Sequence, residues 1–402
     1  MKKSLIALAV LAASGAASAQ SSVTLFGIVD AVYQNLRADA PNGVTRKLSR
    51  IHNSGYNSSR LGFRGTEDLG GGMSASFWLE AGVNNDDGTG QASNANNQRI
   101  GSFNATTGAN APVRSGTQGL TFNRRATVSL AGGWGELRIG RDYVPSFWNH
   151  TVFDPFGTNG VGSQSNLSLA LGSSLGVPTT VRASNSVGYF LPANLGGFYG
   201  QAMYAFGENT EPVTPAAGNF FADKNEGRYI GLRLGFASGP FNVAASYGRT
   251  RATGTIVGGL NALDPVAFPV AAFAGADFDY VNQNIAGQWD FGMAKLLAQW
   301  NQEKIRGGDL KHTTWMIGTL VPVGAGEIRA SYVRGKADDD VMRGDQLAIG
   351  YVHNLSKRAA VYATFARINN KDTADINYSN GLAPTAVGGN TRGFDLGVRH
   401  SF

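Results

Sequence analysis

The chain has 402 residues, no cysteine, a formal net charge of +6 and a mean hydropathy of −0.14. The lack of cysteine excludes a disulfide scaffold, a zinc–thiolate site and a cysteine nucleophile. Its 55 glycines, about twice the usual share, are typical of many tight turns and closely approaching strands. Stretches with a helical period are scarce, so we predict an all-β protein.

The N-terminal segment is organised like a cleaved secretion signal. Lys2 and Lys3 precede an apolar stretch from Leu5 to Ala13, and Ala17-Ser18-Ala19 fits a signal-peptidase site. The apolar stretch is too short for a membrane anchor that spans a bilayer. We therefore predict cleavage after Ala19, which leaves residues 20–402 as one barrel domain. Loss of two lysines lowers the net charge from +6 to +4 over the remaining 383 residues.

Strands with two-residue alternation begin directly after the predicted signal. Such alternation places successive side chains on opposite faces of a sheet. The first predicted strands, in chain order, are residues 22–33, 58–67, 73–83, 120–130 and 136–141. Residues 68–72 and 132–133 are rich in glycine, which predicts tight hairpin turns between consecutive strands.

Short turns and long polar connections continue to alternate along the chain. Short turns recur near residues 196, 239, 292, 324 and 356. The long connections are residues 84–119, 145–180, 208–224, 252–277 and 369–390. This alternation is typical of an outer-membrane barrel, and we count about sixteen strands. We predict a closed transmembrane antiparallel β-barrel, because hydrocarbon cannot satisfy a free sheet edge.

The last ten residues alternate up to a terminal aromatic side chain. Phe394, Leu396, Val398 and Phe402 share one face of this predicted strand, and polar or small residues occupy the other. One face suits lipid and the other suits water, although a soluble sandwich strand could show the same pattern. Aromatic residues near strand ends favour the membrane reading: Tyr189, Phe198, Tyr204, Trp289, Trp300, Trp315, Tyr332 and Tyr351.

Four stretches, in order, resemble the Gram-negative general-diffusion porins, especially their beta-proteobacterial branch. They are residues 22–30, 59–70, 135–141 and 393–402. The resemblance implies a homotrimer of sixteen-stranded barrels in the outer membrane of a Gram-negative bacterium. It also implies a third external loop that folds inward to narrow each pore. Phe402 would be the signal read by the barrel-assembly machinery, and outer-membrane lipid and lipopolysaccharide would surround the barrel.

The inward loop implied by the resemblance corresponds to residues 143–180. By the same resemblance, Asp154 is the leading candidate for an acidic group at the pore constriction. Turn chemistry offers an alternative, in which Asp154 makes an Asx-type turn before Pro155. Asp154 is the one acidic residue between Pro145 and Thr180, which is sparse for a loop expected to face basic wall residues.

The barrel wall opposite this loop is predicted to be basic. Strand parity directs Arg60, Arg64, Arg125 and Arg182 toward the lumen. The resemblance places Arg60 and Arg141 at constriction positions, yet strict alternation would point Arg141 toward lipid unless a bulge intervenes. The alternative lumen residues are Arg138, Asp30 and Glu136. Each arginine could instead be a solvated wall residue without a role in selectivity.

Several guanidinium groups in a narrow pore concentrate anions and repel cations. We therefore expect passive diffusion of small hydrophilic solutes and ions, with anions preferred. One alternative is a substrate-specific anion channel on the same fold, and a second is a non-conducting, surface-adhesive β-protein.

Other function classes lack their motifs in this chain. The five histidines are not spaced as a metal pair, and no Gly-x-Ser-x-Gly elbow occurs, so an enzyme is not expected. No basic cluster for nucleic acid lies outside the signal segment. We expect no cofactor and no bound metal, apart from weak calcium binding as an alternative at residues 84–88 and 338–340.

Overall fold

The computed structural model describes residues 22–402 except 95–96, 98–102, 105–108, 111–116, 209–224, 255–275, 308–309, 339–341 and 372–376. The predicted signal segment, residues 1–19, lies outside the described residues. The short elements are β5 (Gly90–Gln91), β6 (Phe103–Asn104), β7 (Ala109–Asn110), β8 (Thr117–Gln118), α2 (Pro145–Val152), α3 (Ser165–Ser168), α4 (Ala170–Ser174) and a 3₁₀ turn at Pro178–Thr180. None of the helices in the described ranges is long and apolar enough to cross a membrane.

The large sheet is formed by β1 (Ser22–Asp39), β2 (Thr45–Asn53), β3 (Arg60–Gly70), β4 (Met73–Gly82), β9 (Arg125–Gly132), β10 (Gly135–Tyr143), β11 (Arg182–Phe190), β12 (Phe198–Ala205), β13 (Tyr229–Ser238), β14 (Phe241–Gly254), β15 (Ala276–Asp290), β16 (Lys295–Arg306), β17 (Lys311–Val323), β18 (Gly326–Ala337), β19 (Arg343–Asn354), β20 (Ala359–Asn370) and β21 (Asn390–Ser401).

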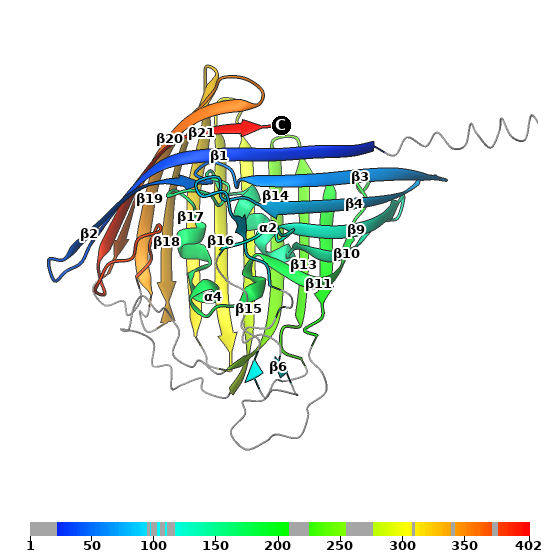
Figure 1. Cartoon of the computed structure of the whole chain (residues 1–402), viewed down its shortest axis with the longest axis horizontal. Coiled ribbons are helices and arrows are strands. Elements are labelled where there is room, and N and C mark those ends of the chain that lie inside the picture. The colour runs from blue at the N-terminus through cyan, green and yellow to red at the C-terminus, as the bar shows by residue number, and fades with distance from the viewer. Residues whose placement is uncertain are drawn as a thin grey trace, which may run out of the picture.

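These strands close into an antiparallel barrel. Except for β2 and β3, which both pair with β1, each strand of the large sheet pairs with the next one in the sheet, and β1 pairs with β21 over Ile28–Asp39 and Asn390–Ser401. The first and last strands of the sheet, β1 and β21, therefore lie side by side in the wall (Figure 1). The predicted all-β transmembrane barrel is confirmed, and its closed ring leaves no sheet edge at the seam.

The sheet contains seventeen strand segments but sixteen positions around the barrel. β2 and β3 both run antiparallel to β1 along the same side, with β2 opposite Ala31–Asp39 and β3 opposite Ser22–Ile28. Residues 54–59 separate them, opposite only two residues of β1. We call this insertion the inner bulge. The predicted count of about sixteen strands thus agrees with the structure.

The inner bulge is held by a buried carboxylate on β1. Asp30 has no exposed surface and accepts hydrogen bonds from the backbone amides of Tyr56 and Asn57 at 2.9 and 2.6 Å. The hydroxyl of Tyr362 donates to its other oxygen. Asp30 shares the inner face of β1 with Gln34, as parity predicts. The carboxylate of Asp30 is therefore used to hold the inner bulge in place.

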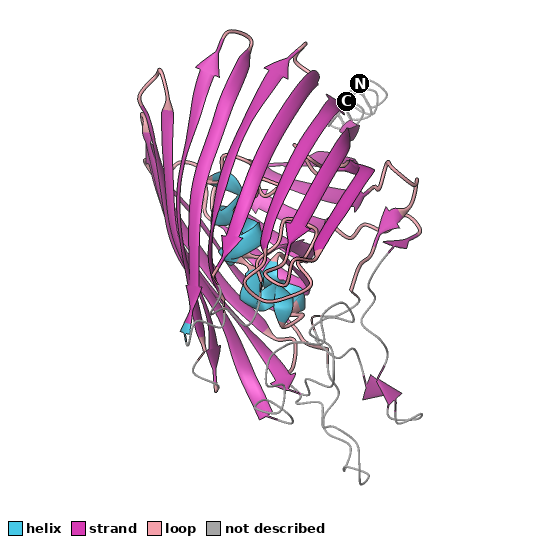
Figure 2. Cartoon of the chain, turned by 90° about the vertical axis from the view of Figure 1, so that its left-hand side faces the viewer, coloured by secondary structure: helices cyan, strands magenta, loops and turns pink. Residues whose placement is uncertain are grey.

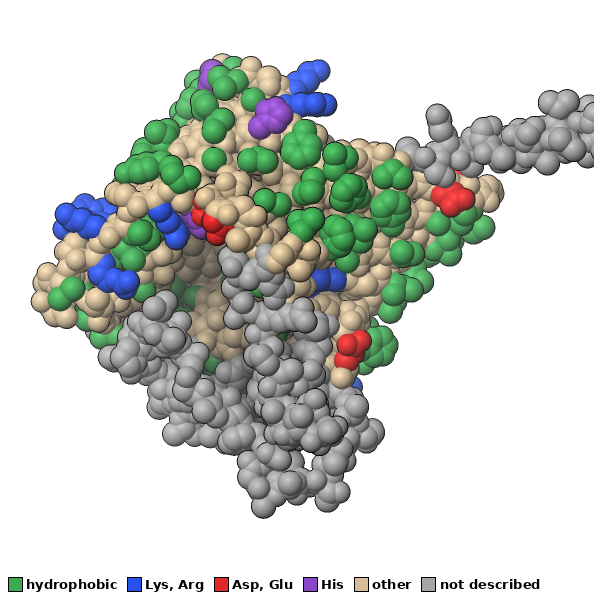
Figure 3. All heavy atoms as spheres, viewed as in Figure 1, with side chains coloured by type: hydrophobic (Ala, Val, Ile, Leu, Met, Phe, Trp, Pro, Cys, Tyr) green, Lys and Arg blue, Asp and Glu red, His purple; other side chains and the backbone are tan. Residues whose placement is uncertain are grey.

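Side-chain polarity is reversed relative to a soluble protein. Large apolar side chains stand exposed on the outer wall, including Val23, Ile51, Phe198 and Trp315, each at 60% or more exposure. Polar side chains on the inner wall are buried, among them Gln34, Asn301, Gln346 and Asp395. The apolar outer face is spread over the front wall in Figure 3. Two-residue alternation produces this arrangement because every second side chain faces lipid.

The connection between β10 and β11 lies inside the ring of strands (Figure 2). Pro145 starts α2 at a position where the helix needs no amide donor and the fixed φ of proline fits. Phe153 then packs against Ala244 and Ala286 of the inner wall. We call residues 145–181 the inner loop. It fills one side of a lumen too wide for wall side chains to fill.

Two sequence expectations about strand boundaries were wrong. β1 extends to Asp39 and returns as β2, where the sequence predicted no strand. The outward positions of β2 carry Lys47 and Ser49, so its alternation is not apolar against polar. β9 starts at Arg125 instead of Leu120, since Asn123 is used as a side-chain acceptor for the Gly82 amide.

We expect Asp30→Ala to lower the free energy of unfolding by about 3 kcal/mol, because it leaves buried donors of the inner bulge unpaired. Tyr362→Phe removes a single donor and should cost about 1 kcal/mol. Urea unfolding of the lipid-reconstituted protein, followed by tryptophan fluorescence, measures both. Equal stability of Asp30→Ala and the unaltered protein would contradict this role.

Candidate functional site

One sector of the inner wall carries a concentrated set of arginines. Five adjacent strand positions, from β3 through β4, β9 and β10 to β11, bring these side chains together. We call this set the arginine wall: Arg60, Arg124, Arg125, Arg138, Arg141 and Arg182. The structure thus places most of the predicted lumen arginines, from distant parts of the sequence, on one side of the barrel.

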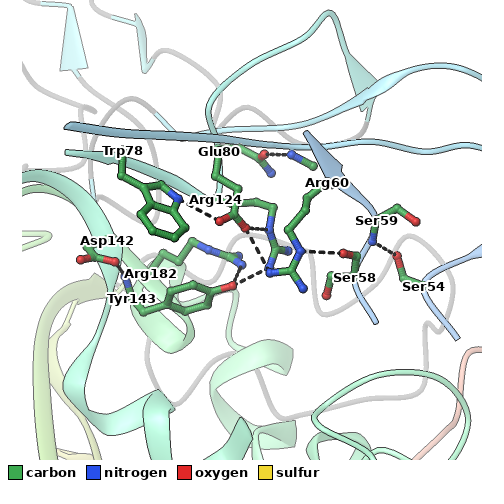
Figure 4. A network of polar contacts seen from close by, with 12 residues as sticks. Ser54, Ser58, Ser59, Arg60, Trp78, Glu80, Arg124, Asp142, Tyr143 and Arg182 are labelled. Atoms are coloured by element: carbon green, nitrogen blue, oxygen red, sulfur yellow. Dashed lines mark hydrogen bonds and ion pairs between the residues drawn. The ribbon is translucent and has the colours of Figure 1, made fainter. Parts of the chain in front are cut away.

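One part of the arginine wall is organised by Glu80, a buried carboxylate of β4. Glu80 accepts from Arg124 Nε at 2.5 Å, from Arg60 Nη1 at 3.4 Å and from Trp78 Nε1 at 3.0 Å. Figure 4 shows the two guanidinium groups beside one another at this carboxylate. Removing Glu80 would leave buried Arg124 without its ionic partner, a change that typically costs about 3–5 kcal/mol.

Tyr143, the last residue of β10, connects Arg124 to a further arginine, Arg182. Its hydroxyl accepts hydrogen bonds from Arg124 Nη2 and Arg182 Nη2, both at 2.6 Å. The Arg182 guanidinium also lies over the Tyr143 ring, 4.3 Å from its centroid. Stacking on an aromatic face stabilises the planar cation without neutralising its charge. The two positive charges therefore remain close to each other (Figure 4).

A second part of the arginine wall is organised by two acidic residues of β10, Glu136 and Asp142. Arg138 pairs with Glu136 at 2.7 Å and with Asp142 at 3.0 Å, and Arg125 lies 3.7 Å from Asp142. Glu136 and Arg138 share the inner face of β10, as parity predicts. Each arginine here has an acidic partner, so this group contributes less excess charge than its number of arginines indicates.

Arg141 reaches the arginine wall through a break in the strand register. The pairing of β10 with β11 shifts between Gly140 and Asp142. Gly140 has φ +128°, and a Cβ there would lie 2.1 Å from the carbonyl oxygen of Ala126, so the bulge depends on glycine. Arg141 Nη1 donates to the hydroxyl of Ser184 at 2.8 Å.

The arginine wall has an excess of positive charge. Its six guanidinium groups face three carboxylates, those of Glu80, Glu136 and Asp142, which leaves three positive charges uncompensated. Arg60 is its most accessible ion-paired member, with 24% of the side chain exposed. Arg64 lies outside this network, stacked over the ring of Trp78 at 5.2 Å.

The carboxylate of Asp154 is used within the inner loop. It accepts from the backbone amides of Phe156, Thr158 and Gln164 at 3.0, 2.9 and 3.1 Å, and the residue is 5% exposed. Burial raises the pKa of this carboxyl to about 6, although the three amides favour its charged form. This geometry matches the turn alternative, in which Asp154 fixes the loop backbone.

The inner loop is bonded to the wall on the far side from the arginines. Asn149 donates to Asn284 at 2.8 Å, Gln164 to Gln299 at 2.9 Å and the Gly172 amide to Glu303 at 2.8 Å. The amide of Val161 donates to Asp395 at 2.9 Å. Polar side chains on the inner faces of β15, β16 and β21 therefore hold the loop against the wall by hydrogen bonds.

The inner loop also touches the inner bulge. Ser58 donates to Asn159 at 2.8 Å, and a Cβ on Gly160 would lie 2.3 Å from the carbonyl oxygen of Gly55. Gly160 has φ +64°, so this close approach and its backbone conformation both require glycine. The inner loop and the inner bulge are therefore in direct contact.

Several residues of the site were missed in the sequence. Arg124, Glu80 and Tyr143 form the centre of the network but were not predicted. Parity within β9 selected Arg125, whereas Arg124 precedes the strand and turns inward beside it. The two consecutive arginines, Arg124 and Arg125, could have indicated this position in the sequence. Nothing in the sequence singles out Tyr143 or Glu80, because their partners are set by the register between neighbouring strands.

Asn84–Gly88, an alternative calcium site, forms a turn in which Asp86 accepts from Asn53 at 3.1 Å. Most of the other alternative, residues 338–340, lies outside the described residues. No group of three or more His, Asp or Glu able to hold a metal occurs within the described ranges.

Comparison with known proteins reveals close similarity along the whole chain. The family model described as Gram-negative porin matches residues 5–373. Outer membrane porin protein 32 of Delftia acidovorans is 37% identical, with both chains covered completely. The solved anion-selective porin from Comamonas acidovorans has a TM-score of 0.73 and 33% identity, covering 95% of this chain and all of that one. The trimer form of OmpT from Vibrio cholerae has the same fold, with a TM-score of 0.59 and 15% identity, covering 95% of this chain and 99% of that one.

We expect Asp154→Ala to loosen the inner loop, because three backbone amides lose their acceptor. Limited proteolysis, with cleavage sites mapped by mass spectrometry, should show new cuts within residues 145–180. Thr151→Ala is the control, since Thr151 donates one hydrogen bond to the Gly157 carbonyl. A protected loop in the Asp154→Ala protein would show that the carboxylate does not hold it.

Proposed function

We propose that this chain, which belongs to the Gram-negative porin family, is an outer-membrane channel that passes small hydrophilic solutes by diffusion and prefers anions. The family and the closed barrel make it an outer-membrane porin. The preference for anions is our inference. It rests on one observation: the inner loop presents no acid to the arginine wall, since its single carboxylate is buried in its own turn.

The charge balance of the opening supports anion preference. A pore with carboxylates on the loop and guanidinium groups on the wall would carry a transverse field with little net charge. Here the arginine wall has an excess of three positive charges, and the loop offers neutral groups. In a narrow opening, a net charge of one sign raises the concentration of the opposite ion. The similar solved porin described as anion-selective agrees with this inference.

Arginine suits this role better than lysine would. The guanidinium group stays charged under all physiological conditions, and its several donors can bind a carboxylate or ring while others still face the opening. Arg60 illustrates this, because Nη1 meets Glu80 and Nε meets the Ser58 carbonyl. We therefore propose Arg60, Arg125, Arg138, Arg141 and Arg182, together with Arg124, as the residues that set selectivity. Arg64 is proposed as a basic residue beside the opening.

We infer a homotrimer, as in the trimer form of the structurally similar OmpT. The edge of β2 away from β1 pairs with no other strand within the described ranges, which supports contact with a neighbouring copy. Assembly would use the terminal Phe402, which is 43% exposed at the end of the last strand. We assign the protein no catalytic role and no cofactor.

Reversal potential in a potassium chloride gradient across a planar bilayer tests the anion preference. The unaltered channel should prefer chloride. Arg60→Gln should reduce the chloride-to-potassium permeability ratio about tenfold, since in water a charge about 6 Å away attracts chloride by about 0.7 kcal/mol and repels potassium by the same amount, which is about 1.4 kcal/mol in the ratio. Glu80 keeps Arg124 as its partner in this variant.

The matched control is Arg334→Gln, because Arg334 of β18 is exposed on the outer wall, on the same face as Tyr332. This variant should leave the reversal potential unchanged. Cation preference of the unaltered channel would contradict the proposal. Conductance that saturates with one particular anion would instead identify a substrate-specific channel, and lack of conductance would favour the adhesive alternative.

A further inference from the structure

One buried arginine of the inner wall, outside the arginine wall, has no acidic partner. Arg233 of β13 is 9% exposed, and its Nε donates to Oδ1 of Asn149 on α2 at 2.7 Å. Within the described residues, Arg233 forms no ion pair and its two Nη groups donate to no protein acceptor. A buried charge without a counter-charge is costly. An anion at the Nη groups would therefore stabilise this position.

Arg233 lies on the lumen side of the wall, where the inner loop meets it. Its neighbours in the strand, Leu232 and Leu234, are 46% and 52% exposed on the outer wall, so parity directs Arg233 inward. The guanidinium lies over the ring of Tyr199 on β12, 4.9 Å from the ring centroid. Tyr199 and Asn149 thus use one face and the Nε of the guanidinium. The edge that carries the two Nη groups is left for a ligand.

A second unused donor lies directly across the sheet from Arg233. Gln201 of β12 is the cross-strand partner of Arg233, and the Cβ atoms of such partners are about 5 Å apart. Gln201 is 5% exposed, and its Nε2 has no hydrogen-bond partner in the described part of the chain. A buried donor without an acceptor is also unfavourable. One acceptor group shared by Arg233 and Gln201 would satisfy both side chains.

An aromatic side chain continues this row toward the arginine wall. Phe190 of β11 lies directly opposite Gln201, and the Arg138 guanidinium lies 3.7 Å from the centroid of its ring. Neighbouring strands are about 4.8 Å apart, so Phe190 and Arg233 are about 10 Å apart along the wall. That spacing suits a ligand with a charged end at Arg233 and a short hydrocarbon group beside Phe190. We call Phe190, Tyr199, Gln201 and Arg233 the Arg233 row.

The chain around the Arg233 row offers no negative charge. Strands β12, β13 and β14 contain no Asp or Glu, and neither does α2. On the β14 side, Arg233 lies opposite Ser246, whose hydroxyl donates to Asn284 at 2.7 Å. The arginine wall differs, because three carboxylates are shared among its six guanidinium groups. The counter-charge of Arg233 therefore comes from outside this part of the chain.

We propose that the Arg233 row binds the carboxylate of a small organic acid that passes through the channel. The two Nη groups form a fork that matches the two oxygens of a carboxylate, and the Gln201 carboxamide can donate to one of the same oxygens. The Phe190 ring offers apolar surface to the hydrocarbon part, which an inorganic anion lacks. This inference rests on the proposed passage of anions, and it adds a site separate from the arginine wall.

The test measures the chloride current of single channels in a planar bilayer while benzoate is added at neutral pH. Benzoate should reduce the current of the unaltered channel saturably. Arg233→Gln should raise the half-blocking concentration at least about tenfold, because the charged fork is lost. Arg233→Lys keeps the charge without the fork and should have a smaller effect. Gln201→Leu removes one donor and should raise the half-blocking concentration about threefold.

Two other probes and two control variants separate the site from general effects. Benzamide has the shape of benzoate without its charge, and inorganic phosphate has charge without a hydrocarbon part. Both should block at least about tenfold more weakly than benzoate. Arg334→Gln is the matched control and should be blocked like the unaltered channel. Asn149→Ala removes the bond between Arg233 and the inner loop but keeps the guanidinium, so block should stay within about twofold.

Equal block of Arg233→Gln and the unaltered channel would overturn the site, as would equally strong block by benzamide or inorganic phosphate. An Arg60→Gln variant that weakens block as much as Arg233→Gln would place benzoate along the whole pore, which also overturns it. If Arg233→Gln does not assemble, Arg233→Lys and the three probes on the unaltered channel decide. Cation preference would contradict the proposed function, whereas block that depends on Arg233 would still establish the site.

Discussion

The structure depends on one constraint: backbone amides and carbonyls in a bilayer must be hydrogen-bonded within the protein. A sheet meets this constraint only by closing on itself, which it does where β1 pairs with β21. Closure then fixes the side-chain pattern, because every strand has one face toward lipid and one toward the lumen. The inverted polarity of the molecule follows directly, with apolar side chains exposed outside and polar side chains buried inside.

The inner wall has two kinds of polar residue with two different tasks. Uncharged amides and a few acids on β15, β16, β19 and β21 bond the inner loop, as Asn284, Gln299 and Gln346 do. Arginines on β3, β10 and β11 and at the start of β9 lie together on another sector of the inner wall. The loop presents no acidic group to the arginine wall, because its one acidic side chain, Asp154, is hydrogen-bonded to backbone amides of the loop itself. In the proposed channel, the placement of this carboxylate away from the arginine wall leaves the excess positive charge uncompensated.

The close approach of several cations has a cost that local partners reduce. Glu80 and Asp142 each contact two arginines, and Tyr143 accepts from Arg124 and Arg182 while stacking beneath Arg182. These contacts hold the guanidinium groups in place but do not neutralise all of them. Rigid positioning with residual charge is what a selective opening requires, since mobile side chains would form ion pairs and lose their effect on passing ions.

The sequence by itself determined the barrel class, the approximate strand number and the inward direction of Arg60, Arg125 and Arg138. Those properties follow from two-residue alternation and turn chemistry, which act over a few neighbouring residues. The turn at Asp154 was one of two alternatives that the sequence offered, whereas tertiary structure alone decided the partners of Glu80 and Tyr143 and the inward turn of Arg124. These features depend on the register between strands that are far apart in the chain, and a shift of a single residue in that register would bring different side chains together.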